Sequence, residues 1–403
     1  MKNIQHLLLL LFISLTIGSC DIGDNEADPA SSFLKIYDHN DYEASYIPID
    51  IKQTTDGGYL ILAATKKDSY FAGVRLMKVN DKGKFEQEQD LSNEFVHPVG
   101  ELMEISGNFY FVAMREADLR AFIFMVDNTG TVADPIETGL TSPLVTSITS
   151  DGNILLLSYN NSDLLTVCSE MTVDGKVSKS ASFTIGAGTT EDGEPARTIL
   201  DGFKRLGSKP PYAIGKMNNQ TYYFNGFYNY TLSLVFTSLA EDNAVQGVLQ
   251  GVHRESAISS VKQLANNTFS LSRYNSGDNY IVPKTELQSL SINSVDDLPG
   301  NTFPELVNNA PVTVKSVSIK GKEIALFASN TKNGQIVMLA FDAANGVLVG
   351  TKYLGFGNTY EVSAFSETED EGLVVLGHSY LTGRFARICV FKLSKEELDE
   401  LVD

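Results

Sequence analysis

The chain has 403 residues, of which 43% are hydrophobic and 10% aromatic, and its formal net charge is −19. This hydrophobic content is ample for a large core. The strong negative charge argues against nucleic acid as a partner, and no long apolar segment follows the N-terminal one, so nothing further along the chain is expected to span a membrane.

The first 19 residues have the three parts of a lipoprotein signal peptide. Lys2 supplies the positive charge, Leu7 to Leu15 form an apolar run, and Gly18 and Ser19 directly precede Cys20. A plain secretory signal with a chance cysteine and an N-terminal transmembrane anchor are the alternatives, but a span needs about 20 apolar residues. We therefore expect a mature protein that begins at a lipidated, palmitate-bearing Cys20 and is held at a membrane by its acyl chains.

Residues 20–32 are acidic, small and polar, so they predict a flexible tether. The Asp21 to Asp28 segment resembles the surface-export signal of Bacteroidota outer-membrane lipoproteins. That resemblance implies an outer-membrane lipoprotein that faces the cell surface. In enteric-type bacteria, an Asp directly after the cysteine would instead imply retention at the inner membrane.

A turn followed by an apolar strand recurs seven times in the remainder of the chain, as in Thr55 to Gly58 before Tyr59. The strands after these turns begin at Tyr59, Phe109, Ile154, Tyr222, Phe269, Ile324 and Leu373. The first and last starts are 373 − 59 = 314 residues apart over six intervals, and the resulting period of roughly 52 is typical of propellers and other repeat arrays.

Most repeats contain a second Asp-Gly or Asn-Gly turn downstream, as at Asp81 to Gly83 and Asp174 to Gly175, which predicts four antiparallel strands per repeat. Residues 33–394 thus predict an all-β, seven-bladed β-propeller. The last repeat ends after its third strand, so we expect Phe33 to Tyr37 to close the ring as its fourth. Six or eight blades, a pair of β-sandwiches and a solenoid are the alternatives, and residues 395–403 predict a short helix-like tail.

The sequence contains no recognisable catalytic or metal-binding motif. Cys168 and Cys389 lie in apolar strands and are expected to be buried rather than bridged or reactive. The histidines His39, His97, His253 and His378 are scattered, and the Asp-Gly turns lack the further carboxylates of calcium loops. We accordingly expect no cofactor, no metal and no enzymatic activity.

In a propeller, the loops between second and third strands and the connections between blades emerge at one face. Tyrosine and arginine, the residues enriched in interface hot spots, are frequent in these loops. The two longest insertions, 187–211 and about 290–311, fall on the same face. The candidate binding-face residues are Tyr70, Arg115, Tyr159, Phe227, Tyr228, Tyr230, Arg273, Tyr274, His378, Tyr380 and Arg384.

The signal, the tether and the Asp56 to Tyr59 turn together resemble Bacteroidota surface lipoproteins that carry β-propeller domains. By this resemblance we expect a non-enzymatic protein-binding or scaffold subunit of an outer-membrane complex for nutrient uptake or for protein secretion and assembly. A glycan-binding lipoprotein that stacks sugars on tyrosines is one alternative, and a propeller hydrolase or lyase is another. The platforms of the glycan hypothesis are Tyr159, Tyr228, Tyr274 and Tyr380.

Overall fold

The computed structural model describes residues 30–38, 44–66, 70–186, 193–204, 209–240, 245–253, 255–381 and 385–403. The predicted signal peptide 1–19, Cys20 and the predicted tether up to residue 29 lie outside the described residues, as does His39. Within the described residues, no helix is both long and apolar enough to cross a bilayer.

The first sheet has eight strands that form two four-stranded halves. β4 and β6 join the halves through a single pair, Gly73 with Val96, and β5 lies on the outer side of β4. The strands are β2 (Ser45–Gln53), β3 (Tyr59–Lys66), β4 (Gly73–Val79), β5 (Phe85–Asp90), β6 (Phe95–Ile105), β7 (Asn108–Arg115), β8 (Arg120–Val126) and β9 (Ile136–Thr141).

The middle of the chain forms three more sheets, which are antiparallel apart from the pairing of β17 with β21. We call each sheet, and each half of the first sheet, a unit. The third and fourth units contain β10 (Pro143–Ile148), β11 (Ile154–Asn160), β12 (Leu165–Met171), β13 (Val177–Thr184), β14 (Ala213–Lys216), β15 (Tyr222–Tyr228), β16 (Thr231–Thr237) and β17 (Val245–Gln250). The next sheet contains β18 (Ser256–Gln263), β19 (Thr268–Asn275), β20 (Asp278–Glu286) and β22 (Asn301–Thr302), after the short β21 (Ile292–Ser294).

Two four-stranded sheets complete the molecule, and the second of them includes the N-terminal strand. They contain β23 (Val312–Ile319), β24 (Lys322–Asn330), β25 (Ile336–Asp342), β26 (Leu348–Leu354), β27 (Tyr360–Glu367), β28 (Leu373–Leu381), β29 (Phe385–Leu393) and β1 (Phe33–Tyr37). The helices are α2 (Ala196–Phe203) and α3 (Lys395–Leu401), with 3-10 turns η1 (Ala265–Asn267) and η2 (Val295–Asp297).

Burial explains the sequence pattern of each unit. All seven residues of β4 are buried, whereas β5 at the outer edge is exposed or half-buried throughout. Central strands read as continuous apolar runs because neighbouring sheets cover both of their faces, and the outer strands are polar because one face meets water.

The predicted pairing of the first and last strands is present. β1 lies antiparallel to β29, with Phe33 opposite Lys392 and Tyr37 opposite Ile388. The first strands of most neighbouring units also contact one another, and these contacts include β2 with β27 from opposite ends of the chain. β29 is thereby covered by β1 instead of presenting an unpaired edge.

Both long insertions contain secondary structure that the sequence analysis did not predict. The second insertion contributes β21, which runs parallel to β17 as a fifth strand, and β22, a two-residue partner of β20. The first insertion contains α2. The predicted C-terminal helix is confirmed as α3, and it buries Leu398 and Leu401 against the last sheets.

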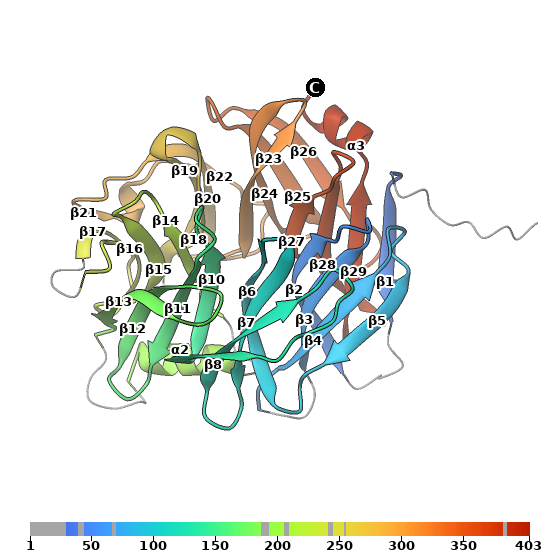
Figure 1. Ribbon diagram of the computed structural model, residues 1–403. Coiled ribbons are helices and arrows are strands. Elements are labelled where there is room, and N and C mark those ends of the chain that lie inside the picture. Colours follow the sequence, from blue (N-terminus) through green and yellow to red (C-terminus); the bar gives the residue numbers. More distant parts are fainter. Residues whose placement is uncertain are drawn as a thin grey trace, which may run out of the picture.

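The sheets expose two different ends. We call the end with the first-to-second and third-to-fourth strand turns the turn face, and the end with the second-to-third connections and the links between units the loop face. In Figure 1, α2 lies at the lower end of the molecule and α3 at the upper end, close to where β1 begins. Phe33 lies against Gly83 of the β4–β5 turn, so the chain enters at the turn face.

Candidate functional site

Helix α2 packs on the loop face through one apolar stripe. Ala196, Ile199 and Phe203 are buried in a core cluster shared with β11 and β15, as their helical spacing allows. Directly after the helix, Lys204 forms an antiparallel bridge with Phe71 of the β3–β4 connection. The insertion is therefore an ordered cover over this end of the molecule between 193 and 204.

A cavity of about 470 Å³ opens beside this cover. Phe227 and Tyr274, two of the predicted binding-face residues, line it together with Lys209 and the Asn309–Val312 segment. The cavity brings together the first insertion, the ends of two sheets and the end of the second insertion.

Several predicted binding-face residues are buried at the ends of strands. Tyr159, Phe227 and Tyr274 are 0%, 2% and 8% exposed and belong to one core cluster. These residues still belong to β11, β15 and β19, and the alternation of side chains along each strand directs them into the core. Buried rings have no free face for a sugar, which leaves the glycan hypothesis with the half-buried Tyr228 and Tyr380.

Two other predicted residues are buried and hold neighbouring groups. The guanidinium of Arg273 lies 4.0 Å from the ring centre of Tyr280 and donates to the Leu298 carbonyl. The His378 Nε2 lies 3.4 Å from Glu361; this contact, more than the opposing burial, lowers the pKa of that carboxyl.

The remaining predicted residues are accessible. Tyr70 and Tyr230 are 58% and 57% exposed. Arg115 lies over the Phe122 ring and forms an ion pair with Asp118. Arg384 lies outside the described residues.

The most exposed aromatic residue of the described chain was not among the predicted residues. Phe356, in the connection from β26 to β27 on the loop face, is 93% exposed. It stands between Gly355 and Gly357, whose φ angles of 88° and 82° suit glycine. Nearby Tyr353 is 45% exposed and donates to Glu305. The sequence signal that could have identified Phe356 is a large aromatic residue between two glycines, just before a repeat begins.

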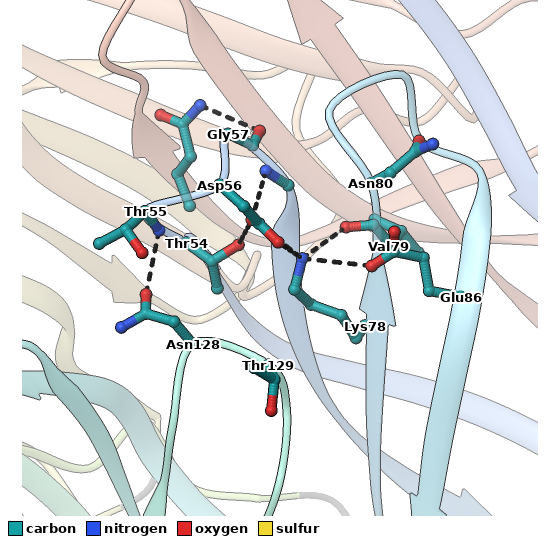
Figure 2. A network of polar contacts seen from close by, with 12 residues as sticks. Thr54, Thr55, Asp56, Gly57, Lys78, Val79, Asn80, Glu86, Asn128 and Thr129 are labelled. Carbon is teal, nitrogen blue, oxygen red and sulfur yellow. Dashed lines mark hydrogen bonds and ion pairs between the residues drawn. The ribbon is translucent and has the colours of Figure 1, made fainter.

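The turn face contains ion pairs built around buried lysines (Figure 2). Lys78 Nζ is 2.8 Å from Asp56 Oδ2, and Asp56 Oδ1 also accepts from Thr54 and the Gly58 amide. Burial acts to raise the pKa of Asp56, but the bonds from Lys78 and Thr54 outweigh it and lower the pKa. This arrangement locks the turn and leaves no group poised for chemistry.

A cluster of charged residues connects the first strands of separate units. Asp50 of β2 is 1% exposed and accepts from the Leu102 amide. The Lys315 Nζ of β23 lies 3.8 Å from Asp50 Oδ1 and 4.0 Å from Glu101 Oε1 of β6. Burial opposes the charge on Lys315, yet the two carboxylates raise its pKa. First strands from distant repeats therefore face a common centre.

The described residues contain no group of three or more His, Cys, Asp or Glu placed to hold a metal ion. Cys168 and Cys389 are free and buried, as the sequence predicts. Burial raises the pKa of both thiols, which keeps them protonated and unreactive.

Comparison with solved structures finds β-propeller domains among those with a similar arrangement. Raptor from Chaetomium thermophilum is 11% identical with a TM-score of 0.50, over 86% of this chain and 28% of that one. The β-propeller domain of the Trilobed protease from Pyrococcus furiosus is 11% identical with a TM-score of 0.47, over 89% and 98%. The Dos1 propeller is 10% identical with a TM-score of 0.46, over 90% and 96%.

No protein-family model and no curated protein matches the chain. The fold is all-β and consists largely of antiparallel sheets, and its structural neighbours are β-propeller proteins. A likeness at these identities concerns the fold alone, and a propeller supports many different functions.

Proposed function

We propose that the chain forms a closed seven-bladed propeller. The two halves of the eight-stranded sheet and the five other sheets supply the blades, with β1 completing the last one. Two observations support closure: β2 contacts β27, and Lys315 of the sixth unit lies near Asp50 of the first. Links on the turn face add to this, since the Glu369 amide of the last unit donates to Gln53 of the first.

We propose that lipid on Cys20 anchors the protein to the outer membrane, with the propeller facing the cell surface. β1 begins at the turn face, where the Ser394 amide donates to Ser32. A tether that enters there leaves the loop face free to point away from its point of attachment.

On this basis, we infer that the protein is a non-enzymatic, protein-binding subunit of an outer-membrane complex for nutrient uptake or protein secretion. The observation that carries the inference is the placement of exposed aromatic side chains. Tyr70, Tyr230 and Phe356, all more than half exposed, lie in three separate connections of the loop face. Exposed aromatics on rigid scaffolds provide the anchors of protein interfaces.

The test compares complexes captured through matched variants of the full-length lipoprotein. Crosslinked detergent extracts from cells with the wild-type protein should yield a defined outer-membrane partner. The triple variant Tyr70→Ser, Tyr230→Ser, Phe356→Ser should lose it at unchanged protein level. Phe85→Ser removes an aromatic that is 46% exposed in the turn-face region and serves as the control. Equal recovery with the triple variant would contradict the proposal.

The glycan-binding alternative is weakened by the burial of Tyr159 and Tyr274. Affinity electrophoresis of the wild-type protein through a panel of polysaccharides tests this alternative. It would be supported if one glycan retarded the protein and Tyr228→Ala abolished the retardation. No arrangement of described residues favours a hydrolase or lyase in particular.

A further inference from the structure

Two cavities lie beneath α2, at the centre of the loop face. They have volumes of about 240 Å³ and 140 Å³, and both are lined by His97, Phe203 and Lys209. Ile47 and Ile49 of β2 form an apolar wall of the larger one. Lys209 also lines the 470 Å³ cavity, so its side chain stands where the three spaces meet.

Among the described residues, the two influences on the charge of Lys209 both oppose it. Its side chain is exposed and lines all three cavities. Burial within the surrounding protein, followed by repulsion from Lys66, lowers its pKa to about 8. No carboxylate of the described residues forms an ion pair with it.

His97 and Tyr212 contribute unused hydrogen-bonding capacity. His97 is 4% exposed, and its ring meets Phe203 edge-on at 4.7 Å without a hydrogen bond to its nitrogens among the described residues. Burial, and then Lys209, lower the pKa of His97, so the ring is neutral and has one N–H to donate. Tyr212 also lines the smaller cavity, and its hydroxyl is buried without a hydrogen-bond partner in the described residues.

The contrast with the Asp50–Lys315 cluster shows what this chamber lacks. There, each buried cation faces a carboxylate. Beneath α2, three lysines line the larger cavity. Lys204 is paired with Asp201, whereas Lys209 has no ion pair among the described residues, in a protein with a net charge of −19. Lys66 repels Lys209, and an anion from solution would relieve this repulsion and accept a hydrogen bond from His97.

We propose that the chamber beneath α2 binds a small organic monocarboxylate, whose carboxylate is held by Lys209 and His97 and whose aliphatic or aromatic body packs on Ile47, Ile49 and Phe203. An apolar body distinguishes this ligand from an inorganic anion. The size of the chamber excludes polymers. The site is independent of the protein-binding role proposed above, because it lies under the cover rather than on the exposed aromatics.

The experiment titrates the purified full-length lipoprotein in detergent with butyrate and with benzoate, using calorimetry and ligand-observed NMR. Inorganic phosphate and the neutral butyramide are the comparison probes. At least one carboxylate should bind at one site, and butyramide should bind at least tenfold more weakly, because a charge-assisted hydrogen bond is lost. Binding of phosphate alone, or no carboxylate binding at 10 mM (roughly the weakest useful affinity), would overturn the proposal.

Lys209→Met should weaken carboxylate binding at least tenfold. Lys332→Met is the control, because that exposed lysine donates to the Pro304 carbonyl and lines none of the three cavities; its affinity should stay within about twofold. Equal affinity of Lys209→Met and wild type would refute the site.

A second readout does not depend on variants. NMR of ¹³C-dimethylated lysines should show the Lys209 amine titrating near pH 8 in the free protein and at a higher pH with the carboxylate bound, since a bound anion stabilises the ammonium. An unchanged titration at saturating butyrate would contradict direct contact.

Discussion

Two turns of the turn face share one design, whereas the described connections of the loop face differ from one another in structure. The turns at Thr54–Gly58 and Thr368–Gly372 each place a threonine and an aspartate around a buried lysine, Lys78 or Lys392. The loop face holds a helix, three cavities and the most exposed aromatic side chain of the described residues, whereas the turn face has one cavity of about 370 Å³. The contrast indicates that these turns serve stability, and it motivates the proposal that the loop face serves binding.

A third turn shows how the design varies. Thr149–Asn153 keeps the threonine, the aspartate and a glycine, but Glu170 occupies the place of the lysine. Glu170 accepts from Asn153 and Tyr222, and Lys216 of the next unit bridges Asp151 and Glu170. A carboxylate thus replaces the lysine of the other turns, and a lysine from the next unit bridges the two acidic residues.

The largest effect is expected from removing β1. Deleting residues 33–37 uncovers the edge of β29 and removes the partly buried Phe33, Ile36 and Tyr37. We expect a loss of about 4 kcal/mol in the free energy of unfolding, with aggregation. Urea unfolding and light scattering measure both. A deletion of residues 21–28 is the control, and equal stability of the two deletions would contradict a closing role for β1.

Gly58→Ala should be the next most damaging change. A Cβ at Gly58 would lie 2.4 Å from both Lys78 Nζ and the Val79 carbonyl oxygen, and that backbone oxygen cannot simply rotate away. We expect a loss of about 3 kcal/mol in the free energy of unfolding.

Gly57→Ala is the matched comparison. Gly57 has a φ of 81° and open space around its missing Cβ apart from an ordinary contact with Asp81, so strain alone should cost about 1 kcal/mol. Equal losses for the two variants would show that the close approach to the Val79 carbonyl oxygen costs no more than backbone strain.

Asp370→Asn should make stability less dependent on acid pH. Burial opposes ionisation of Asp370, but Lys392 and Thr368 outweigh it and lower its pKa. Its contribution is therefore complete above the ordinary value of 3.8 and is lost as pH falls through the lowered folded-state pKa. At pH 7 we expect a loss of about 2 kcal/mol, because Lys392 stays buried without its partner.

Chemical unfolding of wild type and Asp370→Asn between pH 7 and roughly pH 2.5 tests this, and the two curves should converge at the acid end. Glu371→Gln is the control: its pair with Lys395 is exposed, so the change should be below about 0.5 kcal/mol. Parallel curves for wild type and Asp370→Asn would show that the carboxylate contributes no acid-linked stability.

The smallest effect on stability is expected on the loop face. Phe356→Ser removes a ring that is 93% exposed, so the free energy of unfolding should change by less than about 0.5 kcal/mol. Partner binding should weaken about tenfold or more if this ring is an interface anchor. Differential scanning calorimetry and partner titration separate the two. A large loss of stability would contradict the division between the faces.

Much of the fold was predictable from local signals. Gly58 and Gly83 mark turns, and the apolar runs between such turns mark strands, so the hairpins could be located from the sequence. The seven repeats and the missing fourth strand of the last one led to the pairing of β1 with β29.

The candidate site was less predictable. The stretch from Ala196 to Phe203 is helical because its apolar side chains can be buried against sheets that are distant in sequence. β21 and β22 lack a strong strand signal and exist because β17 and β20 offer them an edge. Tyr159 and Tyr274 are of a residue type that is common in interfaces. They are buried because each still lies within the last part of its strand, and this could not be read from the sequence.

The sequence by itself determined the repeat, the turns and the alternation of buried and exposed strands, because these depend on residues close together in the chain. Tertiary structure alone decided which side chains reach the surface and which share a cavity, as with Lys209, His97 and Ile47 from three separate segments. Such groups meet only when the sheets pack around a common centre, and their burial and charge balance depend on neighbours that no local pattern specifies.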